Sequence, residues 1–97
     1  MNYKEILTSN KKVTEADRKF VDAVIAPRIN KEADKDELIS ALTNFIYIMQ
    51  SGYGYMGFSE SVCRRYDITK GKAQQYFDRA RYLVSKLDQD AYMRYID

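Results

Sequence analysis

The chain has 97 residues, 45% hydrophobic and 31% charged, with a net charge of +2, which indicates one domain too apolar for wholesale disorder. It has no histidine and one cysteine, which excludes an internal disulfide, a multi-cysteine zinc site and the Ser-His and Cys-His catalytic arrangements. No apolar run approaches the roughly 20 residues that cross a bilayer, and the first residues lack the apolar core of a signal peptide. We therefore expect a cytoplasmic protein that is not an enzyme, uses no metal or cofactor, and does not bind a membrane.

The spacing of apolar residues predicts an all-α fold, because several segments show helical periodicity and none alternates as a strand would. We expect residues 1–12 to form a flexible N-terminal segment that holds at most one helical turn, around Lys4 to Leu7, followed by a single helical domain over residues 13–97. The first helix of that domain is expected from Thr14, which is placed to cap it, to about Ala26. Pro27 is expected to end it, because the residue before a proline disfavours helical geometry.

A second helix is expected from about Asp36 to Gln50, with Gly52 as its C-cap. Residues 51–57 then form a glycine-rich linker with exposed tyrosines. At the other end of the chain, residues 88–97 have a helical pattern and are expected to pack on the domain or contact another subunit.

Residues 58–87 predict a helix-turn-helix, with helices at residues 59–66 and 69–87 joined by a short turn. Together with the helix at about residues 36–50 they are expected to form the central three-helix unit of a small helical bundle. Helices this close must cross at a small side chain, which Cys63 supplies. Asp67 tolerates the left-handed turn geometry, and Ile68 anchors the turn in the core. The hydroxyl of Thr69 is placed to cap the second helix.

The charge of the chain is distributed unevenly. Residues 61–87 carry a net charge of +5, which leaves −3 for the rest of the chain. The cations of this segment are Arg64, Arg65, Lys70, Lys72, Arg79, Arg81 and Lys86. A basic segment on an otherwise mildly acidic protein is typical of a surface that meets phosphate, although lysine and arginine also solvate ordinary helix faces.

Residues 67–76 and the run Arg79-Ala80-Arg81 resemble helix-turn-helix modules of two kinds. One is the promoter-reading C-terminal region of bacterial sigma factors, where a similar Ile-Ser-x-Gly start and Arg-Ala-Arg end frame the recognition helix. The other is the DNA-binding head of phage small terminase subunits, where one helix ends in Gly-Tyr or Gly-Phe and the recognition helix ends in Tyr-x-x-x-Ala. Gly52-Tyr53, after the second helix, is similar to the second kind.

This chain departs from these modules at two points, which reduce the kinds of protein that the resemblance implies. Asp67 stands where glycine is common, and the linker over residues 53–58 is longer than in sigma-type modules. The resemblance therefore implies a phage-type DNA-packaging protein or a small transcription regulator that binds double-stranded DNA.

In such a module the N-terminal part of the second helix enters the major groove. Lys70, Gly71, Gln74 and Gln75 are then expected to read bases, Gly71 by letting the backbone approach closely. The residues expected to contact the DNA backbone are Arg64, Arg65, Thr69, Lys72 and Arg79.

A module this small buries little surface on DNA, so we expect it to act as a homo-oligomer. The alternative is a small protein-interaction module or inhibitor that binds another protein through an apolar, tyrosine-rich surface. In that case the cations only keep the surface solvated.

Overall fold

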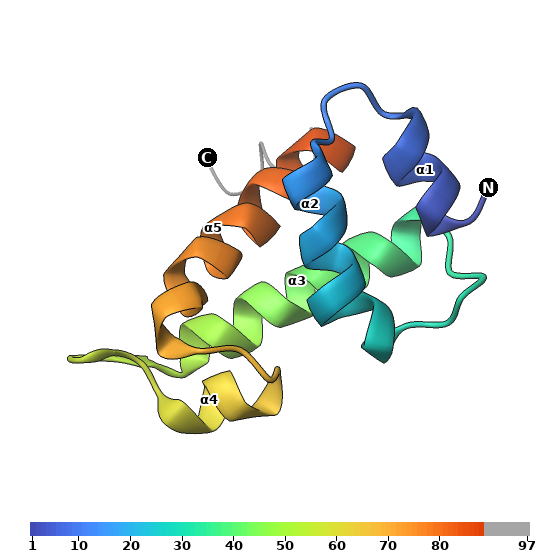
Figure 1. Ribbon diagram of the computed structural model, residues 1–97. Helices are drawn as coiled ribbons and strands as arrows, with labels where there is room; N and C mark the ends of the chain where they lie inside the picture. The colour runs from blue at the N-terminus through green and yellow to red at the C-terminus, as the bar shows by residue number, and fades with distance from the viewer. Residues whose placement is uncertain (89–97) are drawn as a thin grey trace.

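The computed structural model describes residues 1–88, most of which lie in helices and four in a small hairpin (Figure 1). In chain order the elements are α1 Tyr3–Ser9, α2 Glu15–Phe20, a π-helix Val21–Ile25, a 3-10 turn Ala26–Arg28, α3 Lys35–Ser51, β1 Tyr53–Gly54, β2 Gly57–Phe58, α4 Glu60–Arg65 and α5 Lys70–Leu87. The predicted helical class is confirmed, whereas the antiparallel pair β1–β2 corrects the expectation that strands are absent. The helix expected over residues 88–97 falls almost wholly outside the described residues.

The first residues of the chain differ from the flexible segment expected over residues 1–12. Asn2 caps α1, and Tyr3 and Leu7 lie on its inward face, only 2% and 3% exposed. The amide of Tyr3 also donates a hydrogen bond to the carbonyl of Ala33, at 2.7 Å. A helix of seven residues with two inward side chains carries too little periodicity to indicate more than one turn in the sequence.

Two loops with the same local chemistry lead into α2 and α3. In each, an asparagine side-chain oxygen accepts a hydrogen bond from the amide two residues on, at 2.9 Å from Asn10 and 2.8 Å from Asn30. The third residue after the asparagine is buried in the core, as Val13 and Ala33. The next residue caps the helix, so each loop fixes a helix start and anchors it at once.

The helix that begins with α2 does not end cleanly ahead of Pro27. After Phe20 it widens into the π-helix and closes with the 3-10 turn, in which Pro27 occupies an early position. A proline has no amide to donate, so it fits a first turn where that donor would be unpaired. The helical stretch therefore reaches Arg28, slightly past the predicted end.

The core is built on α3, which lies under both α2 and α5 (Figure 1). Leu42, Phe45 and Met49 on its inward face are at most 1% exposed. Phe45 meets Phe20 of the α2 helix edge to face at 5.6 Å, and it meets Tyr66, just after α4, at 4.8 Å. One aromatic side chain of α3 thus contacts both the α2 helix and the residue that follows α4, and it holds α4 against α3.

Candidate nucleic-acid interface

The connection between α4 and α5 has the geometry that the sequence predicts. Asp67 is the only non-glycine residue among residues 1–88 with a positive φ, at 56°, which reverses the chain after α4. Cys63 is buried, and its carbonyl accepts a hydrogen bond from the amide of Ile68 at 3.0 Å. Thr69 caps α5, since its hydroxyl accepts a hydrogen bond from the amide of Lys72 at 3.2 Å. This turn fixes the angle at which α5 leaves α4.

The first two turns of α5 present an exposed face. Lys70, Gly71, Gln74 and Gln75, the four predicted base-reading residues, are all exposed, whereas Ala73 between them is fully buried. A Cβ atom at Gly71 would have Thr69 Oγ1 at 4.0 Å as its nearest neighbour, so the backbone is open to solvent here. The side-chain amide of Gln74 donates to the Asp78 carboxylate at 3.1 Å, which orients this glutamine along the helix.

The start of α5 lacks the acidic residue that the other described α-helices carry. The first turns of α1 to α4 contain acids such as Glu5, Asp17, Glu37 and Glu60, which stabilise the positive end of the helix dipole. The first turn of α5 contains none and instead carries Lys70 and Lys72. This helix start is therefore electropositive, an environment that favours a bound anion.

The end of α4 adds further cations beside this turn. Arg64 and Arg65 are exposed, as their predicted role requires. Arg28 joins them: its guanidinium donates a hydrogen bond to the carbonyl of Arg65 and lies 4.4 Å from the centre of the Tyr66 ring. Burial raises the pKa of Tyr66, although the charges of Arg28 and Arg65 oppose the shift, so its hydroxyl stays neutral. Sequence reasoning missed Arg28 because it lies far from residues 61–87 in the chain.

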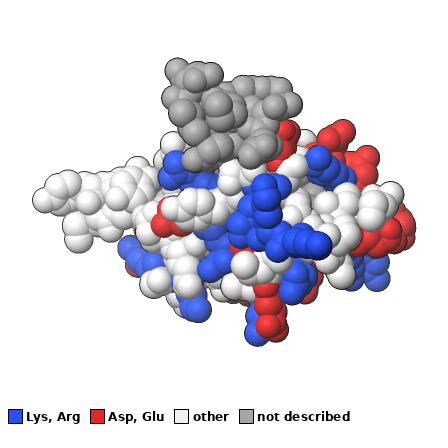
Figure 2. All heavy atoms as spheres, turned by 90° about the horizontal axis from the view of Figure 1, so that it is seen from above, with Lys and Arg blue, Asp and Glu red and all other residues white. Residues whose placement is uncertain are grey.

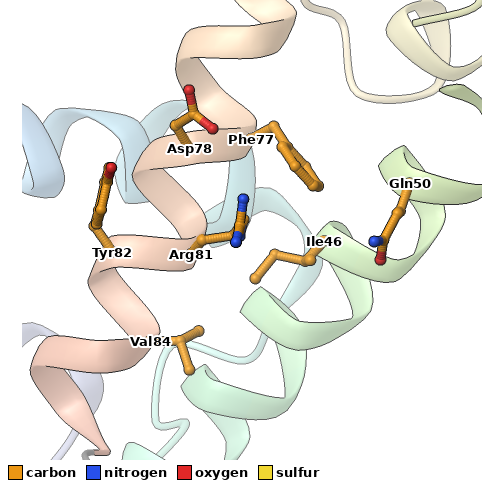
Figure 3. A pocket seen from close by; sticks show the side chains of 7 residues that line it. All are labelled: Ile46, Gln50, Phe77, Asp78, Arg81, Tyr82 and Val84. Carbon is orange, nitrogen blue, oxygen red and sulfur yellow. The ribbon is translucent and has the colours of Figure 1, made fainter. Parts of the chain in front are cut away.

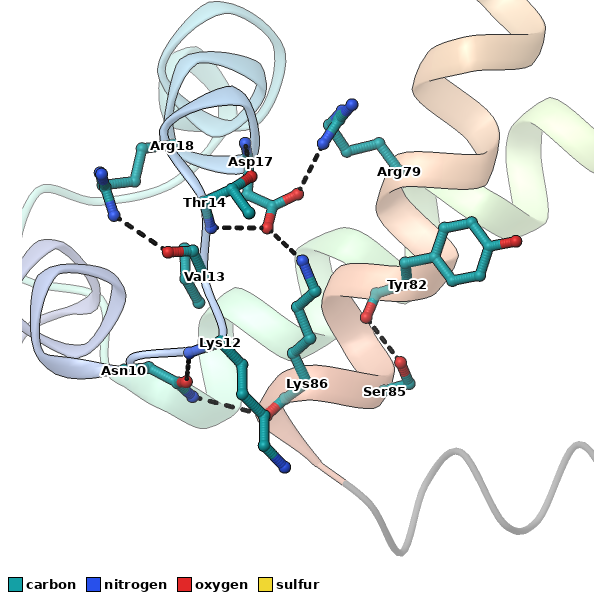
Figure 4. Close-up of polar contacts among 10 residues, drawn as sticks. All are labelled: Asn10, Lys12, Val13, Thr14, Asp17, Arg18, Arg79, Tyr82, Ser85 and Lys86. Atoms are coloured by element: carbon teal, nitrogen blue, oxygen red, sulfur yellow. Dashed lines mark hydrogen bonds and ion pairs between the residues drawn. The ribbon is translucent and has the colours of Figure 1, made fainter.

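Arg79 has a different position from the one its predicted DNA-backbone role implies. Its guanidinium donates to Asp17 Oδ1 at 2.9 Å, and the ammonium of Lys86 donates to Asp17 Oδ2 at 2.6 Å (Figure 4). Asp17 is only 1% exposed, and Thr14 donates its amide to the same carboxylate at 3.0 Å. Arg79 and Lys86 therefore hold α5 against α2 instead of facing solvent freely.

The Asp17 carboxylate is ionised despite its burial. Burial alone would raise its pKa, but the hydrogen bonds from Lys86, Thr14 and Arg79 outweigh that effect, so the pKa of Asp17 is lowered. A buried carboxylate held by two cations is a strong structural link, and it takes two of the seven cations of residues 61–87 away from a DNA-facing role.

Charged side chains separate along the molecule. Figure 2 shows lysine and arginine across the middle of the face seen from above, acidic side chains gathered toward one end, and the uncharged hairpin projecting from the other. The acidic end fits the start of α3, where Asp34 caps the helix and Asp36 and Glu37 follow. The uncharged hairpin thus lies at the opposite end of the molecule from the acidic start of α3.

A groove of about 480 Å³ lies between α3 and α5 (Figure 3). Ile46 of α3 and Phe77 and Val84 of α5 form its apolar floor. The guanidinium of Arg81 reaches over the Phe77 ring, with its central carbon 5.6 Å from the ring centre. The exposed Tyr82 stands at the edge of the groove. This groove is a second candidate binding surface on the described part of the chain, and no sequence pattern indicated it.

Comparison of the chain with protein-family models, with curated proteins and with solved structures found no match. Within residues 1–88 no cluster of three or more side chains is arranged to hold a metal ion. No helix in that same part of the chain has the length and apolarity needed to span a membrane. A function is therefore inferred from the surfaces described above.

Proposed function

We propose that α4, its turn and α5 form a helix-turn-helix that binds double-stranded DNA, with the start of α5 in the major groove. The observation that carries this proposal is the exposed face of the first two turns of α5, with its open glycine and its two lysines at the positive end of the helix. Among proteins with such a unit, a phage DNA-packaging subunit or a small transcription regulator fits the resemblance best.

The polar residues of this face match the chemistry of base edges. Gln75, for which no side-chain hydrogen bond is formed within residues 1–88, can pair with adenine through two hydrogen bonds, and Lys70 can donate to guanine. Gln74 can do the same after leaving Asp78, a weak exposed contact. Gly71 lets the helix backbone approach the groove without a side chain between them.

The contacts to the DNA backbone come from the residues that flank this face. Arg64 and Arg65 at the end of α4 and Lys72 in α5 are exposed, and Thr69 lies with the amides of the helix start, which favour a phosphate. We add Arg28 to this set because of its contact with Arg65. Arg79 leaves the set, since its guanidinium is held by Asp17.

The salt dependence of duplex binding tests the proposal. Affinity for a random duplex is expected to fall steeply as salt rises, because cations of the protein displace condensed counterions. Replacing both Arg64 and Arg65 by alanine is expected to weaken binding to all sequences. The slope of the logarithm of affinity against the logarithm of salt concentration should also become shallower, by about 0.9 for each phosphate that the variant no longer neutralises.

A matched control is Lys35→Ala. Lys35 is exposed at the opposite end of α3 from the hairpin, about 25 Å along the helix by its rise per residue. This variant removes one cation from a distant surface, as Arg65→Ala does from α4, and is expected to bind like the unmodified protein. Absence of duplex binding at low salt would contradict the proposal, and so would equal losses of affinity from the α4 variant and from Lys35→Ala.

A second comparison separates sequence reading from backbone contact. Gln75→Ala is expected to relax sequence preference in a selection from random duplexes, at a cost of about 1–3 kcal/mol for the preferred site. Arg65→Ala is expected to weaken all sequences similarly. Equal, sequence-independent losses of affinity from both variants would exclude base reading by Gln75.

The alternative, a protein-interaction module, is supported by the groove between α3 and α5. Exposed tyrosines at positions 47, 53, 55 and 82 surround this half of the molecule, and tyrosine is enriched at protein interfaces. Chemical footprinting would distinguish the two functions: protection of Tyr82 by a protein other than a second copy of this chain, with no duplex binding at any salt concentration, would favour the alternative.

A further inference from the structure

The hairpin ends in an apolar knob, which we define as Tyr53, Tyr55 and Met56. Their exposed fractions are 58%, 101% and 85%, so Tyr55 and Met56 touch almost nothing. The strands pair Gly54 with Gly57, and Gly57 has a φ of 98°, which closes the tight turn. Figure 1 shows the hairpin projecting away from the helices. Burying such side chains is favourable, so a fully exposed apolar tip indicates a contact with another molecule.

The groove between α3 and α5 is the apolar hollow that suits this knob. Its volume of about 480 Å³ holds a tyrosine and a methionine side chain, and its floor is Ile46, Phe77 and Val84. Figure 3 shows Arg81 directed across the space between the two helices, over that floor. An aromatic ring that enters can stack on the planar guanidinium of Arg81.

We propose that the knob of one copy of this chain occupies the groove of a second copy, and that the two copies exchange knobs about a two-fold axis. The knob cannot fill its own groove. Phe58 at the base of the hairpin packs on Phe77 at 5.4 Å, beside the groove, and the strands continue outward to a two-residue turn. Since the base of the hairpin lies beside the groove on each copy, one two-fold axis can bring both contacts together.

The charges of the two surfaces suit this pairing. Residues 51–59 contain no charged side chain, in a chain that is 31% charged (Figure 2). The groove carries one anion, Asp78, and one cation, Arg81, so it is neutral in sum and does not repel a second copy. The carboxylate of Asp78 can also accept a hydrogen bond from the hydroxyl of a knob tyrosine.

The area of contact favours exchange of both knobs. Two tyrosines and a methionine bury about 450 Å² of the knob, and the groove that receives them exposes less than half of that area. A single contact is therefore smaller than stable interfaces, whereas two contacts together bury roughly 1,200 Å², the lower end of the range of specific interfaces. A reciprocal dimer is therefore the assembly that these surfaces support.

Sedimentation equilibrium of the full chain, without DNA, tests this inference. The average mass is expected to rise from one chain toward two as concentration increases, and to stop there. Tyr55→Ser combined with Met56→Ser is expected to weaken the dimer by at least about tenfold in dissociation constant. Gln50→Trp, which fills the groove from an exposed position, is expected to weaken it similarly.

Tyr47→Ser is the matched control, because Tyr47 is 72% exposed on α3 but does not line the groove. It is expected to leave the dimer unchanged, and all variants are expected to retain the thermal stability of a folded monomer. A mass of one chain at every concentration would overturn the inference, as would a knob variant that associates as well as Tyr47→Ser. A mass that grows beyond two chains would overturn the reciprocal exchange.

Discussion

The two halves of α5 differ in how well their residues serve the stability of the helix. In the second half, Leu83 is fully buried, and Arg79 and Lys86 share the buried carboxylate of Asp17. In the first half, Lys70 faces the positive end of the helix dipole, and Gly71 occupies an exposed helical position where alanine would be more stable.

This difference indicates that the two halves of α5 have different roles. The second half is explained by packing and charge pairing within the fold, so its substitution should change stability first. The exposed face of the first half is not explained by stability, because two of its residues act against the stability of the helix. A residue that weakens a helix and contacts nothing in the fold is best explained by a binding partner, which we propose to be DNA.

The largest expected effect lies in the second half. Asp17→Asn leaves Arg79 and Lys86 without their shared carboxylate, and we expect the free energy of unfolding to fall by about 3 kcal/mol in chemical denaturation. Glu15→Gln, which removes the exposed pair with Lys19, is the control and should cost at most about 0.5 kcal/mol. Equal stabilities of the two variants would contradict the role given to Asp17.

The same carboxylate predicts an acid dependence of stability. Because the pKa of Asp17 is lowered in the folded protein, its contribution is complete above about pH 4, the usual range of an aspartate, and is lost as the pH falls through the folded value. We expect the unmodified protein to lose more stability than Asp17→Asn between neutral and acidic pH. Parallel denaturation curves for the two proteins over this range would count against the ion pairs.

Gly52 has no room for a side chain, in contrast to the exposed Gly71. At Gly52, which ends α3, an added Cβ would overlap the Cγ2 methyl group of Val62, so Gly52→Ala is expected to cost about 1–3 kcal/mol by overpacking. Adding Val62→Ala should make room, so the double variant is expected to lose less stability than the sum of the two single variants, as a double-mutant cycle would measure. Additive losses of stability would mean that the close approach at Gly52 is not limiting.

Much of the helical fold could be predicted from the sequence, because its signals are local. Thr14, Ser59 and Thr69 are caps immediately ahead of apolar periodicity, and they place the starts of α2, α4 and α5 within a residue or two. The hairpin was missed because its strands have two residues each, too short for alternation to show. Only one turn of the helix α1 could be predicted, since the residues that anchor it, such as Ala33, lie far along the chain.

The part of the candidate site that lies on one helix could be predicted from the sequence. The part that depends on packing between distant segments could not. The exposed face at Gln74 and Gln75 follows from helical spacing alone. Arg79 lies about one helical turn after Gln75 and was assigned to the same side of the helix. The sequence does not show that Asp17, 62 residues earlier, lies opposite Arg79. Arg28 could not be predicted as a contact to the DNA backbone, because only the folded chain places its guanidinium on the Tyr66 ring.

At the exposed glycine of α5 we expect a smaller effect of opposite sign. Gly71→Ala meets no neighbour and has no positive φ, so it should stabilise the protein by about 0.5–1 kcal/mol. If the backbone at Gly71 approaches DNA, the same change should weaken duplex binding. Thermal denaturation and a binding titration on one preparation would check both, and a gain in affinity would contradict the close approach.

The most direct test of the central claim is Lys70→Glu, measured for stability and for duplex affinity in the same low-salt buffer. An acid at the start of α5 should stabilise the helix by about 0.3–1 kcal/mol, as acids do in α1 to α4. We predict that stability rises while duplex affinity falls, because the new carboxylate repels the phosphates that the helix start attracts. Duplex affinity that is unchanged or higher in the more stable variant would contradict DNA binding at this helix start.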